Sequence, residues 1–210
     1  MKTQTLLRRT GVAASAGLLL AGLAACGSSD DSASSDTSPM ASSSSATTTK
    51  AAGAGDQTFG PGCSAIPTSG AGSFDGMVKD PVATAASNNP LLSTLVTAVT
   101  KAGLVDTLNG ADGLTVFAPT NDAFSKIPKA TLDKVLADKA TLTAILTHHV
   151  VAGQLDPMNI AGTQTTLNKD KVTVSGDTSG MTVDGANVVC GNIPTANATV
   201  YVIDTVLMPK

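Results

Sequence analysis

The chain has 210 residues and a net charge of −3, and all of its acidic residues are aspartates. Its two arginines are Arg8 and Arg9, so the rest of the chain has no guanidinium group for recognising phosphate or guanine. It has four phenylalanines, one tyrosine and no tryptophan for base stacking, and we therefore expect no nucleic acid partner.

Residues 1–25 have the layout of a signal peptide: a positive head, then an apolar run over residues 12–20 that is too short to span a bilayer. The following Leu23-Ala24-Ala25-Cys26 resembles the lipobox of bacterial lipoproteins. This resemblance implies cleavage before Cys26, acylation of its thiol, and an anchor in the cell membrane facing outside the cytoplasm. An ordinary secretory signal is the alternative. The export route, general or twin-arginine, stays open.

We expect residues 26–58 to be the lipidated cysteine and a disordered tether. Between Gly27 and Gly55 the chain is almost entirely Ser, Ala, Thr, Gly and Asp, which cannot bury enough surface to offset the entropy of ordering the backbone. Thr47, Thr48 and Thr49 are candidate O-glycosylation sites because Ser/Thr-rich stalks are typical acceptors. A bare solvated linker is the alternative.

Two further cysteines, Cys63 and Cys190, leave one possible pair in the oxidising environment outside the membrane. A metal site is disfavoured because the chain has no CxxC motif and no histidine cluster beside them. We expect a disulfide that fixes an N-terminal arm, residues 59–73, to the C-terminal sheet, with a redox role as the minor alternative. We expect no metal and no cofactor.

The folded part begins with helical patterns. Asp80-Pro81 and Asn89-Pro90 each place a capping side chain before a proline, which predicts two helix starts. The second helix has an apolar stripe at helical spacing and ends at Gly103. The stripe consists of Leu91, Leu92, Leu95, Val96 and Val99.

A strand is predicted over Leu114–Ala118, followed by a helix capped by Thr120 or Asn121. Two more helices are expected over residues 131–138 and 141–147. After them the apolar pattern changes to period two, and the expected strands are 150–151, 165–167, 171–174, 181–183, 188–190 and 199–207.

The order of these elements sets the fold class. Helices come first and strands gather late, which predicts an α+β domain with a largely antiparallel sheet. Asp184-Gly185 lies between two of the strands and is typical of a hairpin turn.

Two stretches resemble the conserved boxes of the fasciclin domain: Thr115–Phe124 (TVFAPTNDAF) and Ala198–Pro209 (ATVYVIDTVLMP). The resemblance covers residues 74–209. With the lipobox and the Phe-Gly-Pro-Gly-Cys arm, it extends to actinobacterial cell-surface lipoprotein antigens and their secreted paralogues. It implies a single wedge of helices packed on a sheet, with the two boxes as neighbouring strands. The box residues expected in the core are Val116, Phe117, Phe124, Val202 and Val206.

Between the boxes, the family commonly has a Tyr-His pair that has been linked to adhesion. The matching residues here are His148 and His149, so the chain keeps the histidine and lacks the tyrosine. Adjacent side chains diverge on a helix or a strand, which disfavours joint metal binding. We expect His149 to be a partly buried, hydrogen-bonded structural histidine. A contact in a binding surface is the second interpretation of the pair, and catalysis the third.

The family resemblance implies non-enzymatic adhesion or surface recognition, with an unidentified protein, glycan or lipid as partner. The alternative is an envelope-associated carrier of a lipid or small apolar ligand, which needs an apolar pocket of about 300–1,000 Å³. An enzyme is a third hypothesis. The chain has no Gly-x-Ser-x-Gly, HExxH or phosphate-loop motif, and it has no glutamate for an acid/base pair.

Overall fold

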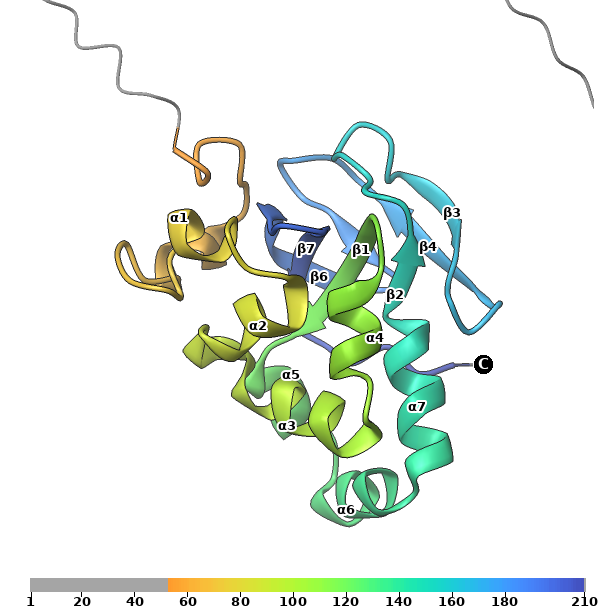
Figure 1. Ribbon diagram of the computed structural model, residues 1–210. Helices are drawn as coiled ribbons and strands as arrows, with labels where there is room; N and C mark the ends of the chain where they lie inside the picture. The colour runs from red at the N-terminus through yellow and green to blue at the C-terminus, as the bar shows by residue number, and fades with distance from the viewer. Residues whose placement is uncertain (1–52, 210) are drawn as a thin grey trace, which may run out of the picture. The chain divides into compact units, whose positions relative to one another are not determined.

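The computed structural model describes residues 53–209 (Figure 1). The predicted signal peptide (1–25), the lipid site Cys26 and the candidate glycosylation sites Thr47, Thr48 and Thr49 lie outside the described residues. Within residues 53–209, every helix is too short or too polar to cross a membrane.

Along the described residues the helices come first, interrupted by a single strand, and the other six strands follow. The helices are η1 (Pro61–Ala65), α1 (Phe74–Met77), α2 (Val82–Ser87), η2 (Pro90–Leu92), α3 (Ser93–Ala102), α4 (Val105–Gly110), α5 (Asn121–Ser125), α6 (Lys129–Ala137) and α7 (Lys139–His148). The strands are β1 (Leu114–Pro119), β2 (Val150–Ala152), β3 (Gly162–Thr165), β4 (Lys171–Ser175), β5 (Thr182–Val183), β6 (Ala186–Pro194) and β7 (Ala198–Ile203). This order confirms the predicted α+β class.

The strands form one sheet in the order β2-β1-β7-β6-β5-β4-β3. All neighbouring pairs are antiparallel except β1 and β7, which run parallel. Thr115 of the first fasciclin-like box pairs with Thr199 of the second, so the boxes are neighbouring strands as expected. An isolated bridge between Val151 and Thr166 brings the two edges of the curled, open sheet together at one point.

Two apolar cores lie on opposite faces of β1, β7 and β6. On β7, Val200 and Val202 face the core shared with the helices, whereas Tyr201 and Ile203 face the second core inside the curled sheet. Figure 1 shows the helices gathered on one side of β1 and β7, with β3 and β4 on the other. The core residues predicted from the two boxes are all buried: Val116, Phe117, Phe124, Val202 and Val206.

Several helix ends agree with the sequence signals. Leu92, Leu95 and Val99 of the predicted stripe are buried in the helix-side core, and Gly103 ends α3 in the left-handed conformation at φ 73°. Thr120 caps α5, because its hydroxyl accepts the Ala123 N–H at 3.2 Å. Asn121, the other candidate cap, instead accepts the N–H of Thr94 at 2.9 Å and thereby ties α5 to the start of α3.

The predicted cap at Asp80 is wrong. Helix α2 begins at Val82 with Pro81 in the capping position, and its first N–H groups are satisfied by side chains far along the chain. The Val82 N–H donates to Asn197 Oδ1 at 2.9 Å, and the Ala83 N–H donates to Asn109 Oδ1 at 3.0 Å. The free backbone donors of a helix start need an acceptor, but the acceptor need not be local.

Asn197 also joins the β6–β7 loop to α4, since its Nδ2 donates to Leu108 O at 2.8 Å and to Ala111 O at 2.9 Å. We predict that Asn197→Ala lowers the free energy of unfolding by about 2–3 kcal/mol, because partly buried backbone groups lose their partners. Urea denaturation measures the loss. Exposed Asn159, whose side chain makes no hydrogen bond within residues 53–209, supplies the control Asn159→Ala. Equal losses for both variants would contradict the assigned role.

The N-terminal boundary of the fold differs from the expected one. Residues 53–58 were expected in the tether, yet they fold back on the domain: the Ala54 N–H donates to Asp75 Oδ1 at 3.1 Å, and Asn192 Nδ2 donates to Gln57 O at 3.1 Å. Strand β3 ends at Thr165, ahead of the predicted strand over residues 165–167. The two residues after it contact β2 instead: Thr166 bridges to Val151, and the Leu167 N–H donates to Val150 O.

Candidate functional site

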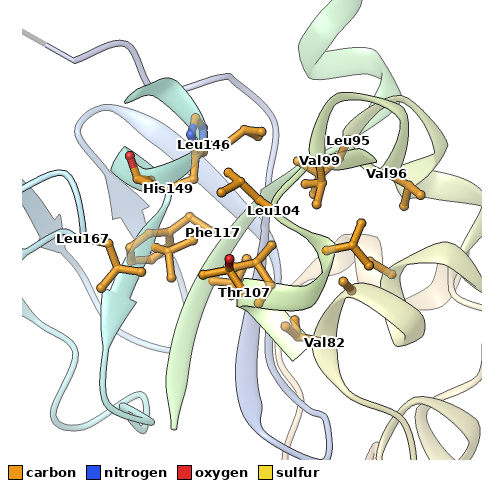
Figure 2. A pocket seen from close by; sticks show the side chains of 17 residues that line it. Val82, Leu95, Val96, Val99, Leu104, Thr107, Phe117, Leu146, His149 and Leu167 are labelled. Carbon is orange, nitrogen blue, oxygen red and sulfur yellow. The ribbon is translucent and has the colours of Figure 1, made fainter. Parts of the chain in front are cut away.

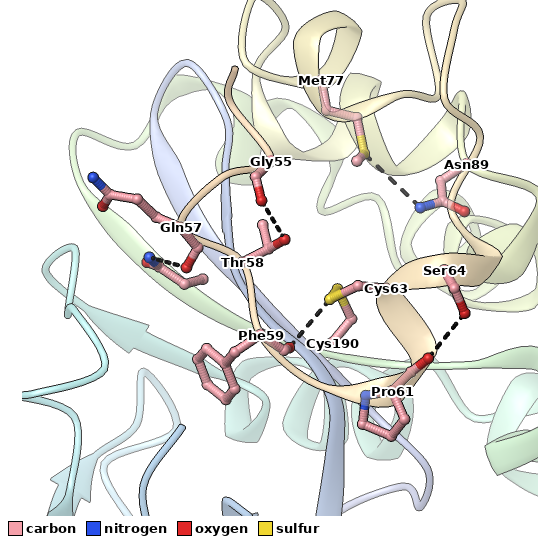
Figure 3. Close-up of a disulfide and its surroundings, with 11 residues drawn as sticks. Gly55, Gln57, Thr58, Phe59, Pro61, Cys63, Ser64, Met77, Asn89 and Cys190 are labelled. Atoms are coloured by element: carbon pink, nitrogen blue, oxygen red, sulfur yellow. Dashed lines mark hydrogen bonds between the residues drawn. A yellow bond between two sulfur atoms is a disulfide. The ribbon is translucent and has the colours of Figure 1, made fainter. Parts of the chain in front are cut away.

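The N-terminal arm crosses strand β6 and is fixed there by backbone pairing (Figure 3). Phe59 and Gly191 exchange two hydrogen bonds: Phe59 N to Gly191 O at 3.2 Å, and Gly191 N to Phe59 O at 2.8 Å. The Phe59 ring lies edge-on to Tyr201, with the ring centroids 6.2 Å apart. The arm therefore adds one bridge to the sheet at a bulge of β6.

The disulfide between Cys63 and Cys190, drawn in Figure 3, fixes the same arm covalently. The two Cα atoms are 4.8 Å apart and the cysteines are separated by 127 positions. Cys190 is buried in the helix-side core, and Cys63 packs against that core. The pair expected from the sequence thus joins the arm to the C-terminal part of the sheet, where we placed it.

Two glycines allow this close approach. A Cβ atom at Gly191 would lie 2.3 Å from Cζ of Phe59, and one at Gly60 would lie 2.5 Å from Val189 O. Gly60 also has φ 106°, a conformation that residues with a side chain rarely adopt. The Phe-Gly-Pro-Gly-Cys sequence is therefore suited to wrapping closely around β6.

A groove of about 450 Å³ opens between this arm, the start of α5 and the surface of β6 and β7. We call it the arm groove. Both boxes and the arm contribute to it: Ile66 comes from the arm, Asp122 and Lys126 from the first box and α5, and Val189 and Asp204 from the β6–β7 region. Its volume lies within the range of ligand-binding pockets.

Two of the charged side chains in the arm groove neutralise each other. Lys126 Nζ lies 3.2 Å from Asp204 Oδ2. The carboxylate of Asp204 also accepts the backbone N–H of Asn187 at 2.9 Å and the side-chain Nδ2 of Asn187 at 3.0 Å. Burial raises the pKa of Asp204, but these hydrogen bonds together outweigh burial, and the net pKa is lowered. Asp122 is exposed, and within residues 53–209 its carboxylate makes no hydrogen bond or ion pair.

The histidine pair lies elsewhere, at the end of α7. His149 is 2% exposed; its Nε2 accepts the Leu207 N–H at 2.9 Å, so the neutral ring carries its hydrogen on Nδ1 and donates to Ile145 O at 2.7 Å. Burial lowers the pKa of His149 to about 4, with a further contribution from His148. His149 is thus the structural histidine that the sequence suggested.

His148 is also buried, with 1% exposed, and its Nδ1 lies 2.7 Å from Asp170 Oδ1. Burial opposes ionisation of Asp170, but hydrogen bonds from Thr166 and Asn168, together with the neighbouring His148 ring, outweigh it and lower the pKa of Asp170 to about 2. This contact ties α7 to the β3–β4 turn.

The burial of both rings corrects one interpretation. A contact of His148 and His149 in an exposed binding surface is wrong for this structure, because the end of α7 packs beneath β2 and the C-terminal segment. The two rings are nearly perpendicular, with centroids 6.3 Å apart. Within residues 53–209, His, Cys and Asp side chains form no cluster of three that could hold a metal ion.

A second opening is lined mostly by apolar side chains of α2, α3 and α4 on one side and of β1, α7 and Leu167 on the other, with Thr107, Thr147 and His149 as its polar members (Figure 2). Its cavity measures about 60 Å³. That volume is well below the 300 Å³ or more that encloses a drug-sized or lipid ligand. The core between the helices and the sheet is therefore essentially filled.

Comparison with known proteins agrees with this architecture. The sequence profile of the fasciclin domain matches residues 90–209. The chain is 53% identical over 167 residues to the immunogenic protein MPB70 of Mycobacterium bovis, covering 75% of this chain and 85% of the relative. It is 55% identical over 145 residues to the cell surface glycolipoprotein MPB83 of the same species, covering 67% of this chain and 66% of the relative.

A solved structure shares the fold. It contains a FAS1 domain pair from the insect cell adhesion molecule fasciclin I and superposes with a TM-score of 0.53 at 17% identity. The match covers 64% of this chain and 52% of that chain. The profile match, the two mycobacterial relatives and the shared fold lead to one conclusion: the chain belongs to the fasciclin domain family.

Proposed function

We propose that the protein is an exported lipoprotein, anchored in the membrane through Cys26, whose fasciclin domain (74–209) recognises a partner outside the cytoplasm without catalysis. The observation that carries the recognition role is the arm groove, in which both family boxes and the disulfide-bonded arm (within 59–73) meet around an open space of about 450 Å³. A similar relative is named a cell surface glycolipoprotein, which supports this placement.

The tether supplies reach in this proposal. Its Ser/Ala/Thr-rich composition suits a solvated spacer between the lipid and the domain, now taken to end near residue 52 rather than 58. The glycan suggested by the same relative's name would be carried by Thr47, Thr48 and Thr49.

The competing functions receive less support from the described residues. A carrier needs an enclosed apolar space, and the apolar cavity of about 60 Å³ holds only a few atoms. An acid/base enzyme needs an accessible titrating group, whereas both histidines are buried and engaged in contacts that join α7 to other segments. Recognition by an open groove needs neither an enclosed apolar space nor an accessible titrating group.

The variant Cys26→Ala tests the anchor. We expect it to leave the folded domain unchanged and to shift the protein from the membrane fraction to the soluble fraction, or to leave an uncleaved precursor, because the acyl chains supply the membrane affinity. Fractionation with Triton X-114 and immunoblotting measures the shift. The matched control is Ser28→Ala, which removes a hydroxyl in the tether. A normally cleaved Cys26→Ala protein that remains wholly in the detergent phase would contradict the anchor.

A further inference from the structure

The arm groove has one unpaired charge, and its sign is negative. Of its three charged side chains, Lys126 and Asp204 are paired at 3.2 Å, and the exposed carboxylate of Asp122 remains without a partner within residues 53–209. Position 122 lies in the first turn of α5, where a negative charge is favoured. That position accounts for the presence of an acid there, and the groove beside it gives the acid access to a ligand.

Most of the remaining lining of the groove is apolar, with Thr120 and Asn121 as its uncharged polar members. Ile66, Leu91 and Val189 line it together with the buried Cys190 of the disulfide. Lysine and arginine have an aliphatic stem that packs on apolar surface and a charged head that stays in contact with water or a carboxylate. An apolar wall beside a free carboxylate is complementary to such a side chain. It is also complementary to an apolar residue next to that lysine or arginine in the ligand.

The charge of the whole domain favours the same class of ligand. Residues 53–209 contain thirteen aspartates and eight lysines, a difference of −5. A net negative surface attracts cationic partners over distances of about a Debye length and repels acidic ones.

We propose that the arm groove binds an exposed segment of a partner protein in which a lysine or arginine adjoins an apolar residue. The cationic head pairs with Asp122 while the stem and the apolar neighbour pack against Val189 and Leu91. This inference rests on the proposed recognition function and names the chemistry of the partner. The lipid anchor at Cys26 does not depend on the chemistry of the groove's ligand, so a negative result for the groove leaves the anchor standing, and the reverse also holds.

NMR titration of the ¹⁵N-labelled chain from residue 26 onward, expressed without residues 1–25 and made soluble by Cys26→Ala, tests the proposal. The probe is the blocked peptide Ac-Gly-Leu-Lys-Leu-Gly-NH₂, and the same peptide with glutamate in place of lysine is the control. We expect saturable shifts of the backbone amides of Leu91 and Val189 with the lysine peptide at concentrations up to about 10 mM. The glutamate peptide should give none. The affinity should fall as NaCl is raised from about 0.05 to 0.5 M.

The variant Asp122→Asn should weaken binding of the lysine peptide about 2–5-fold, the effect of one exposed ion pair. The matched control is Asp106→Asn, since Asp106 is an exposed acid in the first turn of α4, outside the groove, and should leave the affinity unchanged. Three results would overturn the proposal: no shifts at the groove, equal binding of the glutamate peptide, or equal effects of the two variants. Binding of n-butylamine as tight as that of the peptide would overturn recognition of a protein segment.

Discussion

Replacing Cys63 with serine should lower the free energy of unfolding by about 4–5 kcal/mol in non-reducing buffer. The disulfide closes a loop of 127 positions, so its loss frees a large part of the unfolded chain and raises the entropy of that state. For a domain of this size the melting temperature should fall by about 10–20 °C. Differential scanning calorimetry at neutral pH measures both quantities.

The reduced wild-type protein is the control for this prediction. In dithiothreitol it should melt close to the Cys63→Ser variant, because both lack the same covalent link. Cys190→Ser should be less stable still, since its hydroxyl would be buried in the helix-side core where Cys190 is 1% exposed. Equal melting of oxidised wild type and Cys63→Ser would mean that the disulfide contributes nothing to stability.

Acidification should destabilise the domain between pH 6.5 and pH 4. The pKa of His149 falls from its ordinary value of 6.5 to about 4 in the folded protein because the ring is buried. In this interval the unfolded chain binds a proton and the folded protein does not. The contribution of neutral His149 is therefore complete above pH 6.5, and about 3 kcal/mol is lost by pH 4. Urea denaturation across the interval measures the slope.

The variant His149→Gln separates this effect from other titrations. It should be less stable at pH 7 by about 2–3 kcal/mol, because the Leu207 N–H and the Ile145 carbonyl lose their ring partner. Its stability should change much less between pH 6.5 and 4 than that of wild type. Loss of stability tied to Asp170 belongs to a lower interval, since its pKa moves from 3.8 to about 2. A variant with the wild-type slope would exclude His149 as the cause.

Sequence patterns predicted the features that depend on neighbouring residues. The adjacency of the two boxes followed from the family resemblance, although their parallel direction did not. The alternation of Val200, Tyr201 and Val202 between the two cores follows from strand geometry. The turn at Asp184-Gly185 forms the expected hairpin, with φ of 45° and 88° at the two residues.

The features that depend on distant residues could not be read from local patterns. Helix α2 receives its caps from Asn109 and Asn197, and no signal beside Val82 indicates either. Helices α1 and α4 were missed because four to six residues carry too short a periodic pattern to distinguish from a loop.

The arm groove was missed for the same reason, since its walls come from segments that meet only in the folded chain. One signal was available: Asp122 and Asp204 are charged residues within boxes that also supply many buried core residues. The histidine pair is the cluster in the sequence most suggestive of chemistry, and the structure places it in the interior.

The proposed function requires that the domain be held outside the cytoplasm by a lipid on Cys26, the expected first residue of the mature chain. Mass spectrometry of the N-terminal peptide of protein purified from native membranes tests this directly. We predict that the peptide begins at Cys26 and carries a diacylglyceryl group on sulfur. A mature protein that begins at any other residue, or at an unmodified Cys26, would contradict the account.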